Sequence, residues 1–431
     1  MTGADLDQAL VELEVGAVAA GGACLARAPD GRVVFVRHAL PGEQVRARVT
    51  QETTSYLRAD TVTVLRPSPD RVTPPCPYAG PGRCGGCDWQ HASVPAQRAL
   101  KASLVQDQLR RLARVEREVV VEAVPGSDDG LGWRTRVQFA VGTDGGTGLH
   151  RHRSHGLEPV ERCLIAAPEV EAVGAERLRW PGASAVEVIA SGGQRVVAVT
   201  AGRRRVDRPD VAAGVVVDGR PVAVPHGVRH RVLGRSFEVS AGRFWQVHPA
   251  AATVLAEAVL DGLSPRPGER VADLYAGVGL FAALLGERVG PTGQVLAVEG
   301  DPAACADAAR NTADLRHVRV RTAAVDAALV GGLHAELVVL DPSRAGAGLA
   351  VTRALATLRP RRVAYLACDP ASFARDLRVL LDERWTLASL RGLDLFPMTE
   401  HVELVALLDP PGATAARTGG GAGPAAHRGA P

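Results

Sequence analysis

The sequence has no charge-free apolar run of 18 residues, and aromatic residues make up only 4% of the chain. A membrane-spanning helix needs about 20 consecutive apolar residues, so we expect no such helix and no membrane partner. The first 15 residues are acidic and lack a long apolar stretch. This argues against a secretory signal and makes the cytoplasm the expected compartment. A chain of 431 residues can bury a sizeable core and is expected to form roughly two to four domains.

Cysteine is scarce, and the number of cysteines is odd: the chain has seven. In a reducing compartment a disulfide framework is a poor expectation, and metal binding or catalysis is a better one. Cys24 and Cys305 are interpreted as buried hydrophobic residues, because a small buried thiol is the common fate of cysteine.

Neither sign of charge predominates, since 50 Lys and Arg stand against 47 Asp and Glu, for a net charge of +3. The positive excess lies in residues 71–240, which carry 24 basic and 18 acidic residues. It includes the run Arg203-Arg204-Arg205. This distribution indicates either the solvated charge of an arginine-rich composition or a basic face for a polyanion.

The hydrophobic pattern changes along the chain. Residues 10–66 alternate short β-rich runs with Gly and Pro turns, which predicts a small antiparallel barrel. After a proline-rich boundary, residues 96–114 have the apolar spacing of an amphipathic helix. Residues 133–240 indicate mixed strands, and from about 245 apolar strands alternate with Ala- and Leu-rich helices. That alternation predicts a doubly wound α/β domain with a mostly parallel sheet.

The expected fold class is therefore α/β, with smaller domains before the doubly wound one. We expect four segments: an OB-like β-barrel at 1–70, a mixed α+β central domain at 71–240, a doubly wound domain at 241–409, and a tail at 410–431. The tail contains only Pro, Gly, Ala, Thr, Arg and His and is expected to be disordered.

A glycine-rich turn begins the doubly wound domain. Residues 273–282 follow a strand and begin a helix, and Gly277 and Gly279 permit a tight turn with close approach of a ligand. Glu299 ends the next strand, where its carboxylate can accept hydrogen bonds from ribose hydroxyls. The pattern indicates a nucleotide-like ligand and does not separate S-adenosylmethionine from NAD. The alternative is a helix-capping turn without a ligand.

Chemically useful residues follow the later strands. Asp341-Pro342-Ser343-Arg344 and Cys368-Asp369-Pro370 each come after an apolar strand. Functional residues gather beyond the carboxyl ends of strands in such sheets, so Cys368 is either a nucleophile facing a ligand or a buried thiol. Glu403, between Val402 and Leu404, is either a solvated alternate position or a base facing the cleft.

Five segments, in this order and spacing, resemble the RNA 5-methyluridine methyltransferases: GRFWQVH (242–248), DLYAGVGLF (273–281), DPSRAG (341–346), YLACDPASFARDL (365–377) and FPMTEHVELVALL (396–408). The expected barrel resembles a TRAM domain, an RNA-binding module. The resemblance implies a Rossmann-like, S-adenosylmethionine-dependent enzyme that methylates C5 of a uridine. It implies Cys368 as the nucleophile and Glu403 as the base. The implied contacts to S-adenosylmethionine come from Gln246, Tyr275, Glu299 and Asp341.

Four cysteines form a possible metal site. Cys76, Cys84 and Cys87 lie in a Pro- and Gly-rich loop, and Cys163 lies downstream. Four thiolates suit either zinc or an iron–sulfur cluster. The resemblance favours a [4Fe-4S] cluster, although seven residues separate Cys76 from Cys84 where the family commonly has five.

The implied chemistry needs an activated thiol. Uracil C5 is a weak nucleophile until a thiolate adds to C6. A free cysteine has a pKa of about 8.5 and is mostly protonated at neutral pH. We expect Arg344 to supply positive charge and Glu403, with a raised pKa, to remove the C5 proton. Asp369 stands where the family usually has Asn. A carboxylate beside the thiol is expected to disfavour the thiolate.

The resemblance favours a 23S-type ribosomal RNA target, because tRNA-directed relatives often lack both the barrel and the cluster. A tRNA target is the main alternative. In either RNA the uridine must be flipped or lie in a loop. We expect a monomer. Two other classes remain open: an NAD-dependent oxidoreductase, suggested only by Gly277-x-Gly279-x-x-Ala282, and a catalytically silent RNA-binding protein.

Overall fold

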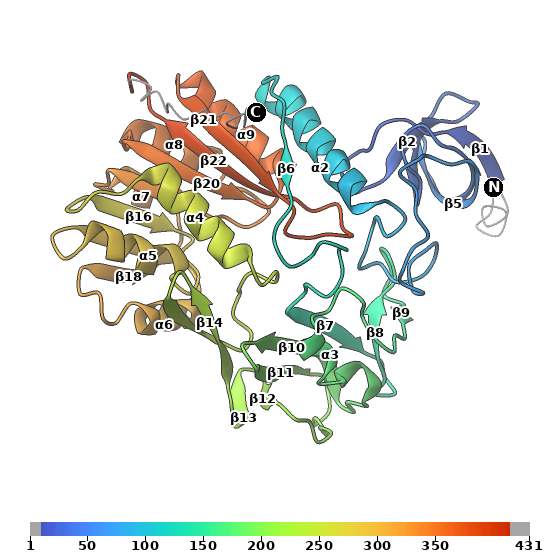
Figure 1. Ribbon diagram of the computed structural model, residues 1–431, viewed down its shortest axis with the longest axis horizontal. Helices are drawn as coiled ribbons and strands as arrows, with labels where there is room; N and C mark the ends of the chain where they lie inside the picture. Colours follow the sequence, from blue (N-terminus) through green and yellow to red (C-terminus); the bar gives the residue numbers. More distant parts are fainter. Residues whose placement is uncertain (1–9, 414–431) are drawn as a thin grey trace, which may run out of the picture.

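The computed structural model describes residues 10–413, whose strands form four sheets (Figure 1). Most of the tail expected at 410–431 lies outside these residues. Within 10–413, no helix combines the length and apolar character needed to cross a bilayer.

The N-terminal strands form one strongly curled sheet. Buried Val45, Ala47 and Val49 alternate with exposed Arg46 and Arg48, so one face of the strand packs inward and the other meets solvent. The prediction that all pairs are antiparallel was wrong, because β3 and β5 are parallel. The edge strands β1 and β2 meet without forming a ladder, so the barrel is not closed. In sheet order the strands are β1 (Leu10–Glu14), β4 (Gln44–Glu52), β5 (Tyr56–Arg66), β3 (Val33–Arg37) and β2 (Cys24–Arg27).

The central part combines a mixed sheet with short helices, as the α+β prediction requires. Trp180 and Phe139 are buried in its core, beneath α3 (Pro168–Glu171) and η2 (Ala175–Arg177). In sheet order its strands are β13 (Arg220–Ala223), β12 (Gly214–Val217), β11 (Gln194–Ala201), β10 (Ala183–Ser191), β7 (Arg136–Val141), β8 (Thr147–His150) and β9 (Leu157–Glu158). A separate hairpin, β14 (Gly227–Val232) and β15 (Arg235–Ser240), packs against α6 (Pro302–Asn311).

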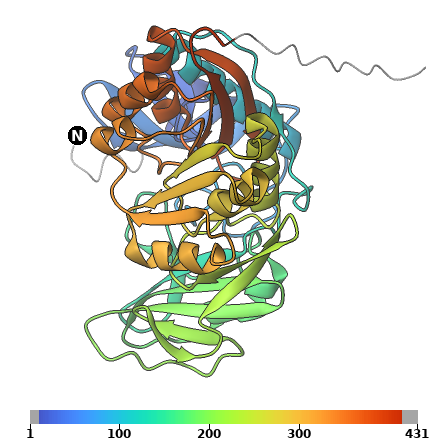
Figure 2. The same cartoon turned by 90° about the vertical axis from the view of Figure 1, so that its left-hand side faces the viewer.

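The C-terminal part is the predicted doubly wound domain (Figure 2). Its strands read as continuous apolar runs, such as fully buried Leu337–Leu340, because helices cover both faces. All neighbouring strands are parallel except β22, which is antiparallel to β20 and β21. The sheet order is β18 (Val318–Thr322), β17 (Gln294–Glu299), β16 (Arg270–Leu274), β19 (Leu337–Leu340), β20 (Arg362–Ala367), β22 (Glu403–Asp409), β21 (Thr386–Leu393) and β6 (Val121–Glu122).

Two groups of helices cover this sheet. One face packs on α4 (Ala251–Leu263) and α5 (Leu280–Val289). The other packs on α7 (Ala327–Gly331), α8 (Leu349–Leu358), α9 (Pro370–Asp382) and the end of the predicted amphipathic helix. That helix consists of α2 (Val94–Gln108) and a π-helical turn, η1 (Leu109–Ala113). It therefore joins the N-terminal half of the chain to the C-terminal sheet (Figure 1).

Candidate active site

Strand pairing brings Cys368 and Glu403 together. Cys368 follows the last residue of β20, and Glu403 is the first residue of the antiparallel neighbour β22. Ala367 pairs with Leu404, so Cys368 and Glu403 occupy the next facing positions beyond that pair. Directly facing residues have Cβ atoms about 4.5–5.5 Å apart. The parallel strands β16, β17 and β19 end at the same edge, which puts Tyr275 and Asp341 there as well.

Cys368 is half-buried among charged groups. Burial, and after it the neighbouring Glu403 and Asp341 carboxylates, raise the pKa of its thiol to about 11, and Arg344 opposes this rise. The thiol is therefore protonated at neutral pH in this arrangement. Arg344 is the cation at the site that favours the thiolate.

The half-buried Asp341 and the buried Glu403 carboxyl groups share the site's negative charge. Burial raises the pKa of Asp341 to about 7. Burial and the proximity of Asp341 raise the pKa of Glu403 well above its ordinary value. Because two ionised carboxylates repel each other in a buried site, this pair retains a proton near neutral pH.

A cavity of about 110 Å³ lies beside Cys368. Its walls come from distant parts of the chain, since Gly21, Leu104, Arg344 and Glu400 all contribute. An Arg344 guanidinium nitrogen lies 3.1 Å from His401 Nε2. Burial and Arg344 lower the pKa of His401 to about 4, so its neutral ring can accept this hydrogen bond. Cys368 lines the cavity, whereas Glu403 is buried and does not line it.

The Asp369 carboxylate, which was expected to disfavour the thiolate, caps a helix. Its Oδ1 accepts a hydrogen bond from the Ser372 N–H at 2.7 Å and caps helix α9. Glu403 and Asp341 are the acidic groups that raise the pKa of Cys368 most. The carboxylate at 369 is thus directed at the helix N-terminus, which stabilises negative charge.

The glycine-rich turn is held by carboxylates from two strands. Glu299 accepts hydrogen bonds from the N–H groups of Gly277 (2.9 Å) and Asp301 (2.8 Å). Asp273 accepts one from Ala282 N–H at 2.8 Å, and its other oxygen has no partner among residues 10–413. Burial raises the pKa of Asp273 to about 7. Tyr275 has a φ of +66° and is half-buried beside this turn.

Gln246 is buried in the segment between β15 and α4. Arg243 in this segment forms an ion pair with Asp301, which follows the strand that ends at Glu299. The ion pair joins the Gln246 segment to the loop that flanks the glycine turn.

The segment before Glu403 is fixed by helix α2, a feature that the sequence analysis missed. Lys101 is the chain's only lysine and its side chain is fully buried. Its Nζ lies 2.5 Å from Asp394 Oδ1 and 2.9 Å from Phe396 O. Gln97 accepts a hydrogen bond from Met398 N–H at 2.7 Å.

The cysteine-containing loop holds the same segment. The N–H groups of Asp88 and Trp89 both donate to Met398 O, at 2.9 and 3.0 Å. The Asp88 carboxylate accepts a hydrogen bond from Glu400 N–H, and Gly21 N–H donates to the Glu400 carboxylate. These four hydrogen bonds attach the segment to the cysteine loop and to the N-terminal part of the chain.

The four predicted metal-ligand cysteines lie around one cavity of about 290 Å³, lined by Cys76, Cys84, Cys87 and Cys163. Among the residues placed by the structure, no group of three or more His, Cys, Asp or Glu side chains is close enough to hold a single metal ion. Cys24 and Cys305 are buried, as predicted.

Comparisons with known proteins agree with this architecture. Residues 9–62 match the TRAM domain family. An uncharacterized RNA methyltransferase of Streptomyces avermitilis is 48% identical, covering 93% of this chain and 98% of the relative. The 23S rRNA (uracil(1939)-C(5))-methyltransferase of Shewanella sp. strain MR-7 is 31% identical, covering 88% and 91%.

A solved structure is similar over almost the whole fold. The Pyrococcus abyssi tRNA (uracil-54, C5)-methyltransferase, in complex with S-adenosyl-L-homocysteine, is 21% identical with a TM-score of 0.67. The match covers 92% of this chain and 100% of that one. Taken with the relatives, the paired Cys368 and Glu403 strands and the TRAM match lead to one conclusion: the chain belongs to the RNA (uracil-C5)-methyltransferase family.

Proposed function

We propose that this protein transfers a methyl group from S-adenosylmethionine to C5 of a specific uridine in RNA. The observation that carries the proposal is the pairing of β20 with β22, which sets a thiol opposite a carboxyl group at the edge where the glycine turn lies. Uracil-C5 methylation needs both a nucleophile for C6 and a base for the C5 proton, and these two residues supply them.

Cys368 and Glu403 divide the reaction between them. The Cys368 thiolate adds to C6, the π electron pair of the C5=C6 bond forms a C4=C5 double bond, and the C4 oxygen takes the negative charge of the resulting enolate. C5 then takes the methyl group as the methyl–sulfur bond of the donor breaks. Glu403 removes the C5 proton, the C6–sulfur bond breaks, and the thiolate is released. Arg344 stabilises the thiolate by its charge.

Gln246, Tyr275, Glu299 and Asp341 are the proposed S-adenosylmethionine contacts. The Glu299 oxygens each accept one backbone hydrogen bond, which leaves lone pairs for ribose hydroxyls. A cationic donor beside Asp341 favours ionised carboxylates. Glu403 has a raised pKa and can hold the proton that it takes.

We propose 23S ribosomal RNA as the substrate, with tRNA as the alternative. The Shewanella relative at 31% identity is named a 23S rRNA methyltransferase, whereas the tRNA methyltransferase at 21% identity supports only the fold. Mass-spectrometric mapping of 5-methyluridine in both RNAs from a deletion strain tests this. Loss of one rRNA site, restored by the wild-type gene but not by Cys368→Ala, is expected; loss confined to tRNA contradicts the rRNA assignment.

We propose that the four cysteines hold a [4Fe-4S] cluster, with zinc as the alternative. A zinc ion needs four sulfurs about 2.3 Å from one point, whereas this cavity of about 290 Å³ has its thiols spread around it. When bound, such a cluster supplies four iron–thiolate bonds that cross-link the loop. Protein purified anaerobically should absorb broadly near the border of the visible and ultraviolet ranges, and should contain about four iron atoms and four sulfides per chain. Stoichiometric zinc without this absorbance contradicts the cluster.

The cytoplasmic location and the monomeric state stay predictions. An NAD-dependent activity gains no support, because it leaves Cys368 and Glu403 without a role. A silent RNA-binding protein is an outcome of the catalytic tests below.

A further inference from the structure

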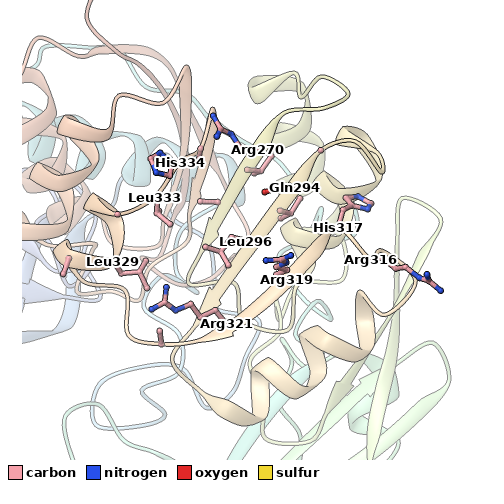
Figure 3. Close-up of a pocket in the computed structure, with 18 of the residues that line it drawn as sticks. Arg270, Gln294, Leu296, Arg316, His317, Arg319, Arg321, Leu329, Leu333 and His334 are labelled. Atoms are coloured by element: carbon pink, nitrogen blue, oxygen red, sulfur yellow. The ribbon is translucent and has the colours of Figure 1, made fainter.

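A second cavity lies on the C-terminal sheet (Figure 3). It has a volume of about 820 Å³ and is lined by the amino ends of β16 and β17 and by the exposed strand β18. The lining reaches Ala323, whose N–H donates to Glu299 O at the carboxyl end of β17. Strand β18 is four strands away from β20 in the sheet, about 19 Å at the usual spacing between strands, so the cavity is separate from the site around Cys368 and Glu403. We call this cavity the β18 groove.

The β18 groove exists because one helix is short. Helix α7 has five residues, whereas α8 and α9 on the same face have ten and thirteen. Strand β18 alternates Val and Arg, so Val318 and Val320 pack on the opposite face with the core, and Arg319 and Arg321 extend into the groove. Figure 3 shows these arginines on one strand, with Leu296 on the neighbouring strand.

Most of the charged side chains that line the β18 groove are basic. Arg316, Arg319 and Arg321 line it, and within residues 10–413 none of the three forms an ion pair or side-chain hydrogen bond. His317 and His334 add two further imidazoles. The single acidic lining residue, Asp326, uses a carboxylate oxygen to cap α7.

A fourth lining arginine does not add free charge. Arg270 forms an ion pair with Glu336 at 2.6 Å. Arg316, Arg319 and Arg321 differ from Arg270, because none of the three forms an ion pair within residues 10–413 and all three line an open concave surface. Unpaired arginines focus a positive potential that suits phosphate groups.

We propose that the β18 groove binds the phosphate backbone of the substrate RNA at a segment distant from the modified uridine. The inference rests on the proposed function for the nature of the RNA. Arg319 and Arg321, on one face of an extended strand, are about 7 Å apart along the chain, so they can contact successive or nearby phosphates. Contacts of this kind orient a folded RNA and carry no sequence information.

The test compares two double variants with equal charge loss. Arg319→Gln/Arg321→Gln removes two groove charges. Arg266→Gln/Arg288→Gln, exposed on the same domain outside the groove, is the control. Binding is measured by filter retention from low to moderate salt, using a 23S rRNA fragment with flanking helices and a short hairpin that carries the target loop. Thermal unfolding verifies that both variants are folded.

For the long RNA, the groove variant should bind several-fold more weakly. Its slope of log affinity against log salt should fall by about 1.4–1.8, since each phosphate contact contributes ~0.7–0.9. The control variant should keep the wild-type slope, and the hairpin should bind all three proteins alike. Equal slopes for groove variant, control and wild type on the long RNA overturn the proposal.

The two proposals fail differently. If wild-type protein methylates RNA but the groove variant keeps the wild-type slope, the β18 groove inference is wrong and the function stands. If no RNA is methylated but the slope falls only in the groove variant, the RNA surface stands and the proposed function is wrong.

Discussion

Lys101 and Asp394 form a buried ion pair that joins helix α2 to the segment leading into β22. The pair lies 293 positions apart in sequence and its atoms approach to 2.5 Å. Lys101 also donates to Phe396 O, so one side chain binds both the Asp394 carboxylate and the backbone of this segment. The position of Glu403 therefore depends on a helix from the first third of the chain.

Lys101→Met should destabilise the protein. It leaves the Asp394 carboxylate buried without its cation, which typically costs about 3–5 kcal/mol. The double variant Lys101→Met/Asp394→Leu removes both charges and should recover most of that loss. Urea unfolding measures the difference. A single variant as stable as wild type contradicts the role assigned to the pair.

Loss of the proposed cluster should loosen the segment before Glu403. Asp88 and Trp89 follow Cys87 directly and donate two hydrogen bonds to Met398 O. In Cys84→Ser protein we expect faster hydrogen exchange in residues 394–402, whereas α5, which is buried in the core of the C-terminal domain, should keep its protection. Unchanged exchange in 394–402 would show that the cysteine loop holds the segment without a cluster.

Asp341→Asn should move the pH profile of kcat towards acid. Ionised Asp341 raises the pKa values of Glu403 and Cys368, and the asparagine has no charge. In the proposed mechanism both groups must lose a proton to act, so in wild type the rate should rise with pH, and without Asp341 the rise should begin at a lower pH. Measurements at saturating S-adenosylmethionine separate this effect from weaker cofactor binding. A shift to higher pH contradicts the proposed coupling.

Asp273→Asn should weaken the pH dependence of stability. Burial raises the folded pKa of Asp273 to about 7, above an unfolded value near ~3.9. The folded state therefore retains a proton, and this contribution is full below pH ~4 and disappears as the pH rises to about 7. The difference in unfolding free energy between pH 5 and pH 7.5 should be smaller in the variant than in wild type. An equal difference shows that this carboxyl group does not bind the proton.

The arrangement of the catalytic edge could be predicted in part from the sequence. The apolar runs before Asp341 and Cys368 indicated parallel strands, and their carboxyl ends share one edge. The facing of Cys368 and Glu403 could not be predicted, because it requires the antiparallel insertion of β22 between β20 and β21. Neither local pattern nor spacing reports the order of strands in a sheet.

Two other features show what local patterns hide. Strand β18 reads as Val-Arg-Val-Arg-Thr and was not predicted, because an edge strand with one open face carries too few apolar residues. Lys101 sits in a helix with ordinary amphipathic spacing, and its acidic partner is far along the chain. By contrast, the start of helix α9 at Asp369-Pro370 can be predicted from the sequence, because Asp is a preferred N-cap residue and Pro a preferred first helical residue.

The most direct test measures both the release of tritium from the RNA and the formation of a covalent bond between Cys368 and the RNA. With [5-³H]uridine RNA and S-adenosylmethionine, wild-type protein should release tritium, and Cys368→Ala should release none. Glu403→Gln should form the Cys368–C6 bond and methylate C5 but fail to eliminate, so a denaturant-stable RNA–protein adduct should accumulate and map to Cys368 by mass spectrometry. Tritium release by Cys368→Ala at the wild-type rate, or an adduct at another residue, would contradict the account.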